Sequence, residues 1–446
     1  MCWIALVIGG EHCLNSLVLR HLVPSGRTSK GSLTISGWSW TAGPKDDVVF
    51  TTLAECEHYD TFVVAAANMA DNSEEKQALT STVISSNHKG PGRLGDPNLK
   101  FFQDPRAHPK LVETFAAFGM DGSQPNPFTN MKWDDLCSST QMAKNHADTM
   151  KLYEMLPNDL PEDAMEPEVE QTTTKFKSFD PTERTLYIFR RVDLTHEAPA
   201  ILYFHGGGMT ILDTANKVHF RWCKSLAVQG LIAITVDFRN AWTPKEANPF
   251  PIGLKDCTSA FHHIVERKSA LGISKILLQG ESGGANLALA TALKAKKEGW
   301  VHQIAGVYGI IPYISNGYGW TDARKLKELP SLYECEGYWL HTGMMAGMSH
   351  FYSGGSAHAE NSLAWPYFAS VEECVGLPPH ALSMDELDPL RDEGMAYYRK
   401  LLAAGVQVTA KVNLGLVHGS GILFRKLLPE MYEGAVRDVV GFAKRV

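Results

Sequence analysis

The chain has 446 residues, of which 44% are hydrophobic and 20% are charged. This length favours one large α/β domain with additions over several independent domains. The 42 basic and 49 acidic residues give a formal net charge of −7, which argues against a nucleic-acid or anionic-membrane partner.

The cysteines and the apolar runs favour a cytoplasmic location. The eight cysteines are scattered without a C-x-x-C pair, and Cys223 and Cys257 fall within predicted core helices, so we expect free thiols in a reducing compartment. No run reaches transmembrane length, which predicts no stable membrane insertion. The apolar stretch 2–8 lacks a basic region before it and is followed by Glu11 and His12, so a signal peptide is the less favoured interpretation.

The first part of the chain divides into two regions. Residues 1–90 hold short β-like pieces and polar stretches without a motif, and we interpret them as an N-terminal extension. Residues 91–170 carry two helical patterns: one spans 108–119, opened by a proline and stopped by a glycine, and the other spans 136–156. The acidic, proline-punctuated stretch 157–170 is typical of a linker or solvated loop.

Residues 171–446 alternate strand-like runs with helical patterns, for example the runs 185–189 and 231–236. This alternation predicts an α/β fold with a mainly parallel sheet, helices on both faces and ligands at the carboxyl ends of the strands. Residues 314–363 interrupt it. They predict either the lining of a pocket for a bulky apolar substrate or an ordinary packed subdomain, and they contain Trp320, Tyr333, Tyr338, Trp339, Met344, Met345 and Met348.

A glycine loop follows the buried strand-like run 200–204. Its sequence is His205, Gly206, Gly207 and Gly208. Consecutive glycines leave backbone N–H groups unshielded, so these groups can point at a developing oxyanion. A flexible loop is the alternative, but it predicts neither the preceding strand nor the histidine. We expect His205 to orient the loop rather than to react.

Ser282 lies in a G-x-S-x-G motif between the apolar run 276–278 and an alanine-rich helical stretch. Gly280 and Gly284 allow a sharp strand–turn–helix unit that exposes a strained serine hydroxyl, which suits a nucleophile. The motif alone is weak evidence in a chain with 38 glycines. Glu281 is expected to support the site or pack beside it rather than to act as a base.

A carboxylate and a histidine follow the last two predicted strands. Asp385 and Asp388 come after the run 380–384, and His418 follows the strand predicted over 406–417. The order serine, acid, histidine is that of the α/β-hydrolase fold. The pattern leaves both aspartates open as the acid, because Asp388 before a proline is also typical of a helix N-cap. A buried core histidine is the alternative for His418.

No metal or nucleotide cofactor is expected. His262 and His263 are adjacent and therefore face different directions on a helix, while His341, His350 and His358 lack ligand spacing with cysteine or carboxylate. The glycine clusters have neither a G-x-G-x-x-G register nor a P-loop lysine.

These motifs together resemble the hormone-sensitive-lipase family of carboxylesterases. The likeness covers roughly residues 91–446 and is strongest from residue 198 onward, and it includes the stretches 236–242 and 364–370. The resemblance is closest to a member that opens a macrocyclic lactone. It implies an α/β-hydrolase fold in which the helical region 91–170 forms a cap over the active site.

The resemblance also implies roles for particular residues. Ser282 corresponds to the nucleophile, Asp388 to the triad acid and His418 to the base. The family's oxyanion donors correspond to three backbone amides, those of Gly207, Gly208 and Gly283. Met209 departs from the family pattern, because many relatives carry an aromatic residue there, and this affects the expected shape of the acyl pocket.

The expected function is that of a serine hydrolase whose partner is a small ester or lactone and which forms an acyl-enzyme. An amidase or arylacetamide-deacetylase-like enzyme would use the same residues and is left open. A non-catalytic small-molecule receptor on this fold would be expected to lack His418, which is present. The sequence does not indicate the natural substrate, nor whether the protein is a monomer or a homo-oligomer.

Overall fold

The computed structural model describes residues 96, 98–120, 126–128 and 130–446 with their side chains, together with three short strands before them. The chain forms two units, residues 1–88 and 89–446. In the first unit, β1 (Ser32–Ile35), β2 (Trp38–Ala42) and β3 (Val48–Thr52) form an antiparallel sheet in that order. The apolar stretch 2–8 and the first three cysteines lie outside the described residues.

The second unit is built on an eight-stranded sheet with the order β11-β10-β9-β8-β6-β7-β5-β4. The strands from β6 to β11 pair in parallel, while β4 and β5 are antiparallel to their neighbours. This is the mainly parallel sheet that the alternation predicts. The strands are β4 (Val169–Lys177), β5 (Glu183–Arg191), β6 (Ala198–Phe204), β7 (Ile232–Val236), β8 (Ile273–Glu281), β9 (Gly306–Ile310), β10 (His380–Asp385) and β11 (Val408–Asn413).

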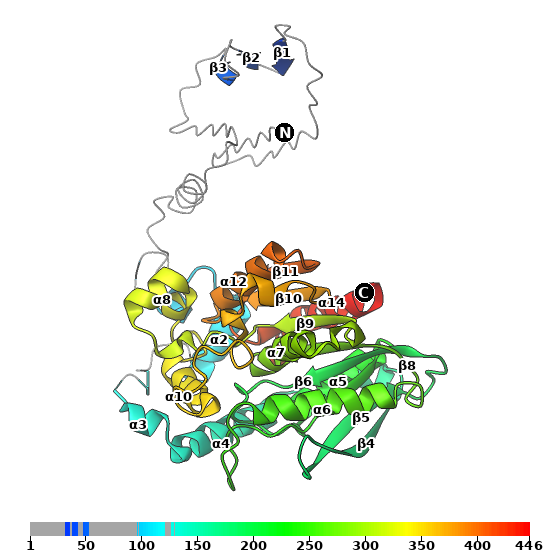
Figure 1. Cartoon of the computed structure of the whole chain (residues 1–446). Helices are drawn as coiled ribbons and strands as arrows, with labels where there is room; N and C mark the ends of the chain where they lie inside the picture. Colours follow the sequence, from blue (N-terminus) through cyan, green and yellow to red (C-terminus); the bar gives the residue numbers. More distant parts are fainter. Residues whose placement is uncertain are drawn as a thin grey trace. The chain divides into compact units, whose positions relative to one another are not determined.

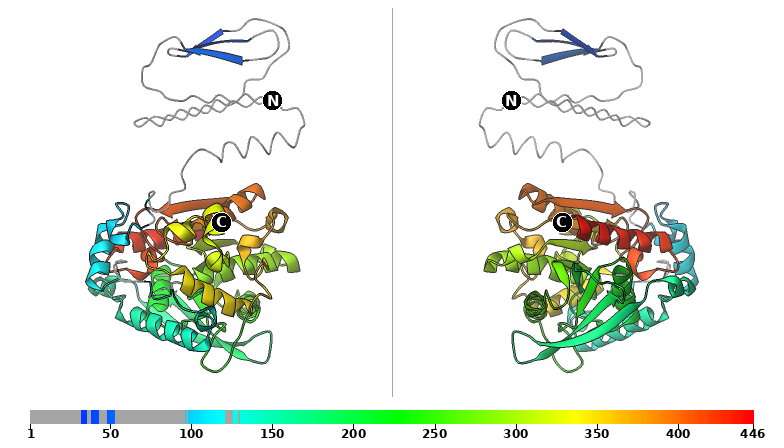
Figure 2. Two further views of the ribbon diagram at one scale, coloured as in Figure 1. Left: turned by 90° about the vertical axis from the view of Figure 1, so that its left-hand side faces the viewer. Right: turned by 90° about the vertical axis from the view of Figure 1, so that its right-hand side faces the viewer.

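Helices cover both faces of this sheet (Figures 1 and 2). The alternation of side chains along β6 shows why both faces need cover: Leu202 and Phe204 belong to one buried cluster, and Ile201 and Tyr203 to another. The first cluster includes side chains of α6 (Ile252–Glu266), α7 (Gly283–Glu298) and α12 (Arg391–Ala403). The second includes side chains of α5 (Lys217–Val228) and α14 (Pro429–Arg445).

The predicted core elements are present, with some shifted ends. Cys223 in α5 and Cys257 in α6 are buried free thiols, as expected. The strand predicted over 406–417 is shorter, because β11 ends at Asn413. The chain turns after it, with Gly415 at φ 74°, a backbone conformation that a strand cannot include.

Two segments far apart in the sequence form the layer over the carboxyl end of the sheet. The N-terminal segment contributes α2 (Pro109–Ala117), α3 (Trp133–Leu136) and α4 (Ser139–Met155). Ser138 caps α4, since its hydroxyl accepts a hydrogen bond from the amide of Gln141, so the helix begins later than the predicted 136. The 3-10 turn Pro161–Met165 then leads into β4.

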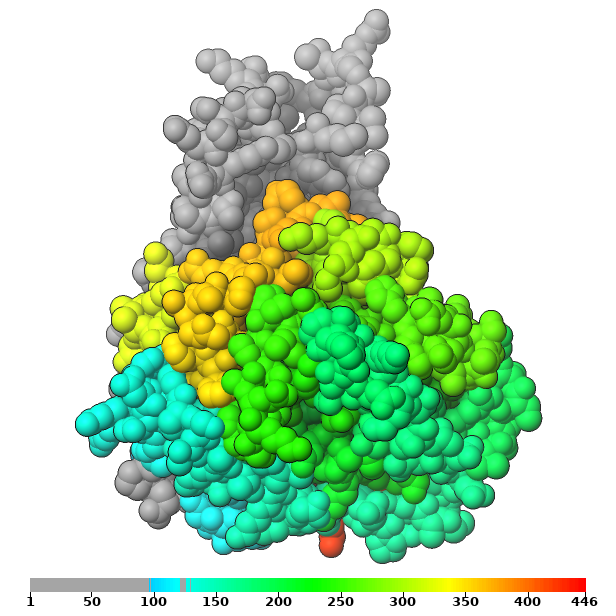
Figure 3. Space-filling view, turned by 60° about the horizontal axis from the view of Figure 1, so that its bottom comes forward, coloured from blue at the N-terminus to red at the C-terminus, as the bar shows by residue number. Residues whose placement is uncertain are grey.

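The insertion after β9 contributes η5 (Gly317–Gly319), α8 (Asp322–Glu328), α9 (Ser331–Glu334) and α10 (Thr342–Ser353) to the same layer. Helix α10 packs on α3, which joins the two segments. In Figure 3 the cyan N-terminal segment lies against the yellow and gold residues of the insertion. The remaining short elements are η2 (Phe101–Gln103), η4 (Val301–Gln303), η6 (Pro366–Phe368), α11 (Val371–Cys374) and α13 (Ser420–Leu423).

The start of α7 lies directly on the end of β6. A Cβ on Gly284 would overlap the carbonyl oxygen of Phe204 and would lie 2.7 Å from the carbonyl oxygen of His205. Both obstacles are main-chain atoms, so no side-chain rotation can relieve the overlap. Glycine at this position therefore fixes how closely α7 approaches the sheet.

We expect Gly284→Ala to destabilise the folded protein by about 3 kcal/mol or more, because backbone must move to admit the methyl group. Gly441→Ala is the matched control, since Gly441 lies in α14 and a Cβ there meets nothing within 4 Å. Alanine should be neutral there or stabilise the helix by up to ~1 kcal/mol. Urea unfolding of both variants measures the difference, and equal midpoints would contradict the close-packing argument.

Candidate active site

Ser282 occupies the turn between β8 and α7. Its backbone has φ 54° and ψ −120°, a combination that non-glycine residues rarely adopt and that stores local strain. The Ser282 amide donates to the carbonyl of Ile310 over 2.9 Å, and the Ser282 carbonyl accepts from the amides of Asn286 and Tyr313 at 3.1 and 3.2 Å. These bonds hold the strand–turn–helix geometry that the G-x-S-x-G pattern predicts.

The glycine loop lies beside this turn. Gly207 and Gly208 have φ values of 94° and 60°, which glycine adopts without strain. A Cβ on Gly283 would lie 2.7 Å from the amide nitrogen of Gly208 and 2.5 Å from that of Met209. The backbones of the loop and of the first residue of α7 are therefore in direct contact.

Met209 directly follows the glycine loop. Its side chain is buried in the core cluster that includes α6 and α7, and it does not line the pocket described below. The backbone of Met209 has φ 57°, so the chain turns sharply at the residue and the side chain enters the core. An effect of Met209 on the shape of the pocket stays a prediction.

His205 is fully buried beneath the glycine loop. Its Nδ1 donates to the carbonyl of Gly206 over 2.7 Å, and its ring stacks on Phe238 at 4.5 Å and on His219 at 4.8 Å. Burial lowers the pKa of His205 to about 4, so the ring is neutral near pH 7. These contacts agree with an orienting role for His205.

Glu281 ties the serine turn to the glycine loop. Its Oε1 accepts hydrogen bonds from the Gly206 amide at 2.6 Å and from the Tyr203 hydroxyl at 2.8 Å. Burial raises the pKa of Glu281 to about 8, despite these hydrogen bonds, which lower it. The carboxyl group is therefore mostly protonated at neutral pH, which removes the cost of burying a charge.

His418 and Asp388 form a buried pair. Nδ1 of His418 lies 2.8 Å from Oδ2 of Asp388, and the two residues are 7% and 0% exposed. The other oxygen, Oδ1, accepts from the amide of Leu390 at 2.9 Å. Asp388 is not the N-cap of α12, because that helix begins at Arg391 with Leu390 in the cap position.

Asp385 makes a different contact. Its Oδ1 accepts from the side-chain amide of Asn413 at 2.8 Å. Burial raises the pKa of Asp385 to about 7, and the neighbouring Asp388 adds to the increase. The sequence left both aspartates open as the acid, and Asp388 is the one that is hydrogen-bonded to His418.

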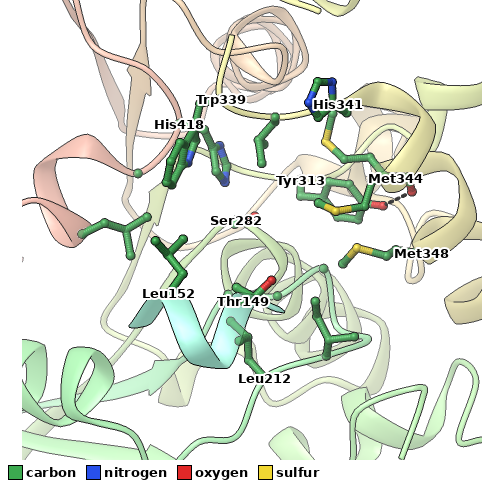
Figure 4. A pocket seen from close by; sticks show the side chains of 18 of the residues that line it. Thr149, Leu152, Leu212, Ser282, Tyr313, Trp339, His341, Met344, Met348 and His418 are labelled. Atoms are coloured by element: carbon green, nitrogen blue, oxygen red, sulfur yellow. Dashed lines mark hydrogen bonds between the residues drawn. The ribbon is translucent and has the colours of Figure 1, made fainter. Parts of the chain in front are cut away.

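Ser282 and His418 line one pocket of about 410 Å³. Gly206, Gly207 and Gly208 line it as well. Figure 4 shows the pocket with Leu152 and Thr149 of α4 on one side of Ser282 and His341 and Met344 on the other. The cavity therefore lies at the carboxyl end of the sheet, between the core and the layer above it.

The insertion after β9 supplies much of the pocket wall. Trp339, Met344, Met345 and Met348 line the pocket, whereas Trp320, Tyr333 and Tyr338 do not. The pocket-lining residues of the stretch 314–363 all fall between 337 and 348, and the remainder of the stretch does not line the pocket. Tyr313, just before the insertion, also lines the pocket.

The sequence did not predict some of the residues that lie next to the site. Tyr203 of β6 donates a hydrogen bond to Glu281, and His219 of α5 stacks on His205. Neither residue lies in a distinguishing motif. Tyr153 of α4 meets His219 edge-on at 5.6 Å. Only the alternation of buried positions along β6 could have placed Tyr203 near the site.

Two further observations concern cofactors and membranes. Within residues 98–446 as described, no group of three histidine, cysteine or acidic side chains is arranged to hold a metal ion. No helix in the described part of the chain has the length and apolar character needed to cross a bilayer.

The chain is similar in sequence and in structure to known proteins. A family model described as "alpha/beta hydrolase fold" matches residues 201–421. Esterase LipI of Mycobacterium tuberculosis is 30% identical over 248 residues, which are 55% of this chain and 72% of LipI. The solved structure of brefeldin A esterase, described as a bacterial homologue of human hormone sensitive lipase, is 46% identical in sequence to this chain. The two structures superpose with a TM-score of 0.75, over 79% of this chain and 97% of the brefeldin A esterase chain. The structure of esterase Est22 is 31% identical with a TM-score of 0.67, over 78% of this chain and 100% of its own.

The raised pKa of Glu281 predicts a pH-dependent stability. An unfolded glutamate ionises near pH 4.5, whereas the folded one ionises near pH 8, so Glu281 stabilises the fold fully below pH 4.5 and loses that contribution as the pH rises to about 8. Glu281→Gln keeps a carbonyl acceptor but cannot ionise. We expect the melting temperature of wild type to fall more between pH 5 and pH 8.5 than that of Glu281→Gln, by an amount equivalent to a few kcal/mol.

Other buried acids, such as Glu393, titrate in both proteins and cancel in this comparison. Thermal melts at the two pH values provide the measurement. Parallel declines in the two proteins would show that Glu281 does not change its protonation in this range.

Proposed function

Since this chain belongs to the hormone-sensitive-lipase family of carboxylesterases and has their α/β-hydrolase fold, we propose that it hydrolyses esters with Ser282, His418 and Asp388 as a catalytic triad. One observation carries this assignment. The hydrogen bond between His418 and Asp388 lies beside a pocket that also holds Ser282 on its strained turn.

The proposed roles follow from the hydrogen-bond geometry. Asp388 accepts a hydrogen bond from Nδ1–H of His418, which leaves Nε2 free to act as a base. Nε2 removes the hydroxyl proton of Ser282 as the serine oxygen attacks the ester carbonyl. The resulting imidazolium, stabilised by Asp388, then gives this proton to the departing alcohol, and an acyl group remains on Ser282.

Water completes the cycle by the reverse use of the same groups. His418 removes a proton from the water molecule, the hydroxide attacks the acyl-enzyme, and the acid leaves as Ser282 regains its proton. The oxyanion formed in each half would be bound by the backbone amides of Gly207, Gly208 and Gly283. The direct contact between Gly283 and the amide of Gly208 supports this assignment.

The substrate that fits the pocket best is a compact, bulky ester or a macrocyclic lactone. A volume of about 410 Å³ and walls rich in methionine and aromatic side chains favour an apolar ligand of irregular shape. The 46% identity to brefeldin A esterase supports a lactone of the brefeldin A type. Long linear acyl chains fit less well, because α4 and α10 close over the pocket.

A hydrolysis panel tests this function. It should contain linear esters of increasing chain length, macrocyclic lactones, and matched ester and amide substrates. We expect turnover of short esters and of a brefeldin-type lactone, with kcat/KM falling for acyl chains beyond roughly ten carbons as the chain meets the cap. Folded Ser282→Ala should lose about 10⁴-fold or more in kcat.

The same panel separates the alternatives. Near-wild-type turnover by folded Ser282→Ala would falsify the triad assignment. A preference for the amide over its matched ester would indicate an amidase, and binding without turnover would indicate a receptor. Activity confined to long-chain lipids would discard the substrate proposal while leaving the triad intact.

A second experiment compares the two aspartates. Asp388→Asn should lower kcat by on the order of 10³ to 10⁴, because an amide in place of the carboxylate favours the wrong imidazole tautomer. Asp385→Asn should cost far less, since Asp385 is bonded to Asn413 rather than to His418. Steady-state kinetics of the two folded variants give the ranking, and the reverse order would move the triad acid to Asp385.

A further inference from the structure

Several polar side chains of the pocket have no part in the proposed mechanism, and His341 is one of them. The hydroxyl of Tyr313 is bonded to the carbonyl of Met345 at 2.6 Å, and that of Thr149 to the carbonyl of Asn145 at 2.7 Å. His341 also lines the pocket. Its ring is partly exposed, and Figure 4 places it near Met344, away from Ser282.

The two ring nitrogens of His341 have different surroundings. Nδ1 is buried, lies 3.6 Å from Oε1 of Glu336 and has no hydrogen bond within the described residues. The Nδ1–Cε1 edge faces Gly337, whose Cβ position would be 3.5 to 3.6 Å from these atoms. Nε2 also has no hydrogen bond among the described residues, but unlike Nδ1 it is not buried. This nitrogen is therefore accessible.

Glu336 fixes which nitrogen carries the proton. Its Oε2 accepts from the amide of Thr342 and its Oε1 from the side chain of Asn126, both at 2.8 Å. Burial would raise the pKa of Glu336, but the neighbouring ring of His341 and the hydrogen bond from Thr342 outweigh burial and hold the pKa below its ordinary value. A carboxylate facing Nδ1 favours the tautomer with the proton on Nδ1, so Nε2 is left as an acceptor.

We propose that Nε2 of His341 accepts a hydrogen bond from a hydroxyl group of the substrate, remote from the ester that reacts at Ser282. The enzyme then prefers hydroxylated esters or lactones over their deoxy counterparts. This inference rests on the proposed ester hydrolysis. It narrows the substrate class, because a hydrogen-bond acceptor on a mainly apolar pocket wall favours substrates that carry a hydrogen-bond donor at the matching position.

A hydroxyl fits this place better than a charged donor. An ammonium group would have to leave water for a wall formed by Met344, Met345 and Trp339, and desolvating a charge costs far more than desolvating a hydroxyl. A substrate carboxylate would need a protonated His341. It would also lie close to the negative charge of Glu336.

Matched substrates test the proposal. One series contains ethyl alkanoates of increasing length with and without a terminal hydroxyl, and the other contains butyrate esters of alkanols with and without a second hydroxyl. Together they probe the acyl and the alcohol sides of the ester. At the best length, wild type should favour the hydroxylated member by about tenfold in kcat/KM, mainly through KM, as one hydrogen bond would give.

Three variants assign the preference to His341. His341→Phe keeps a ring against Phe128 but has no acceptor, so the ratio of kcat/KM for the hydroxylated and deoxy members should fall close to one. Glu336→Gln should reduce the preference less. His350→Phe is the control, because His350 lies in α10, the helix that begins directly after His341, but outside the pocket, so the preference should be unchanged.

The outcomes distinguish this inference from the proposed function. If wild type hydrolyses plain esters without any hydroxyl preference, or His341→Phe keeps the preference, the role of His341 is refuted while ester hydrolysis stands. A stronger preference for amino- or carboxylate-terminated members would also refute it. Failure to hydrolyse any ester would instead refute the proposed function.

Discussion

Two stretches of main chain touch each other at the carboxyl edge of the sheet, one after β6 and one after β8, because residues 283 and 284 have no side chain. These strands are neighbours in parallel register, with Phe204 opposite Gly280. The contact brings the amides of the glycine loop beside Ser282 without any intervening side chain. The rest of the site depends on this contact, since a serine on a strained turn is useful only if the neighbouring backbone lies at a fixed distance.

Buried carboxyl groups hold the loops around that contact. Glu281, next to Ser282, accepts a hydrogen bond from the Gly206 amide of the glycine loop. Glu393, in the first turn of α12, accepts from the amide of Ile314 at 2.5 Å and from the hydroxyl of Tyr318 at 2.8 Å. Burial raises the pKa of Glu281 and of Glu393 to about 8. Each therefore supports its loop mainly as a neutral acid at pH 7, which avoids burying an uncompensated charge.

The N-terminal segment is joined to the neighbourhood of Asp388 by ion pairs. Glu334 of α9 lies between two arginines, with Arg106 at 2.6 Å and Arg391 at 2.8 Å. Arg391 also donates to the carbonyl of Glu386, two residues before Asp388. Both the segment 98–120 and the insertion after β9 are thus anchored close to the acid, whereas the pocket walls above consist of side chains that can adapt. Ser282, Asp388 and His418 come from the core, whereas much of the pocket wall comes from the added segments, so in the proposed mechanism specificity can vary while the chemistry is kept.

The sequence by itself determined the parallel sheet, the strained serine turn and the glycine loop, because each depends on local patterns: strand periodicity, and glycine where backbones meet. It left Asp385 and Asp388 undecided, since both follow β10 within a few residues and only the path of the chain after β11 decides which one meets His418. The side chain of Met209 is buried in the core next to a backbone with positive φ, which no sequence pattern predicts. The proximity of His341 and Glu336 could not be predicted either, because their spacing belongs to no regular element and the position of Glu336 depends on hydrogen bonds from Asn126 and Thr342.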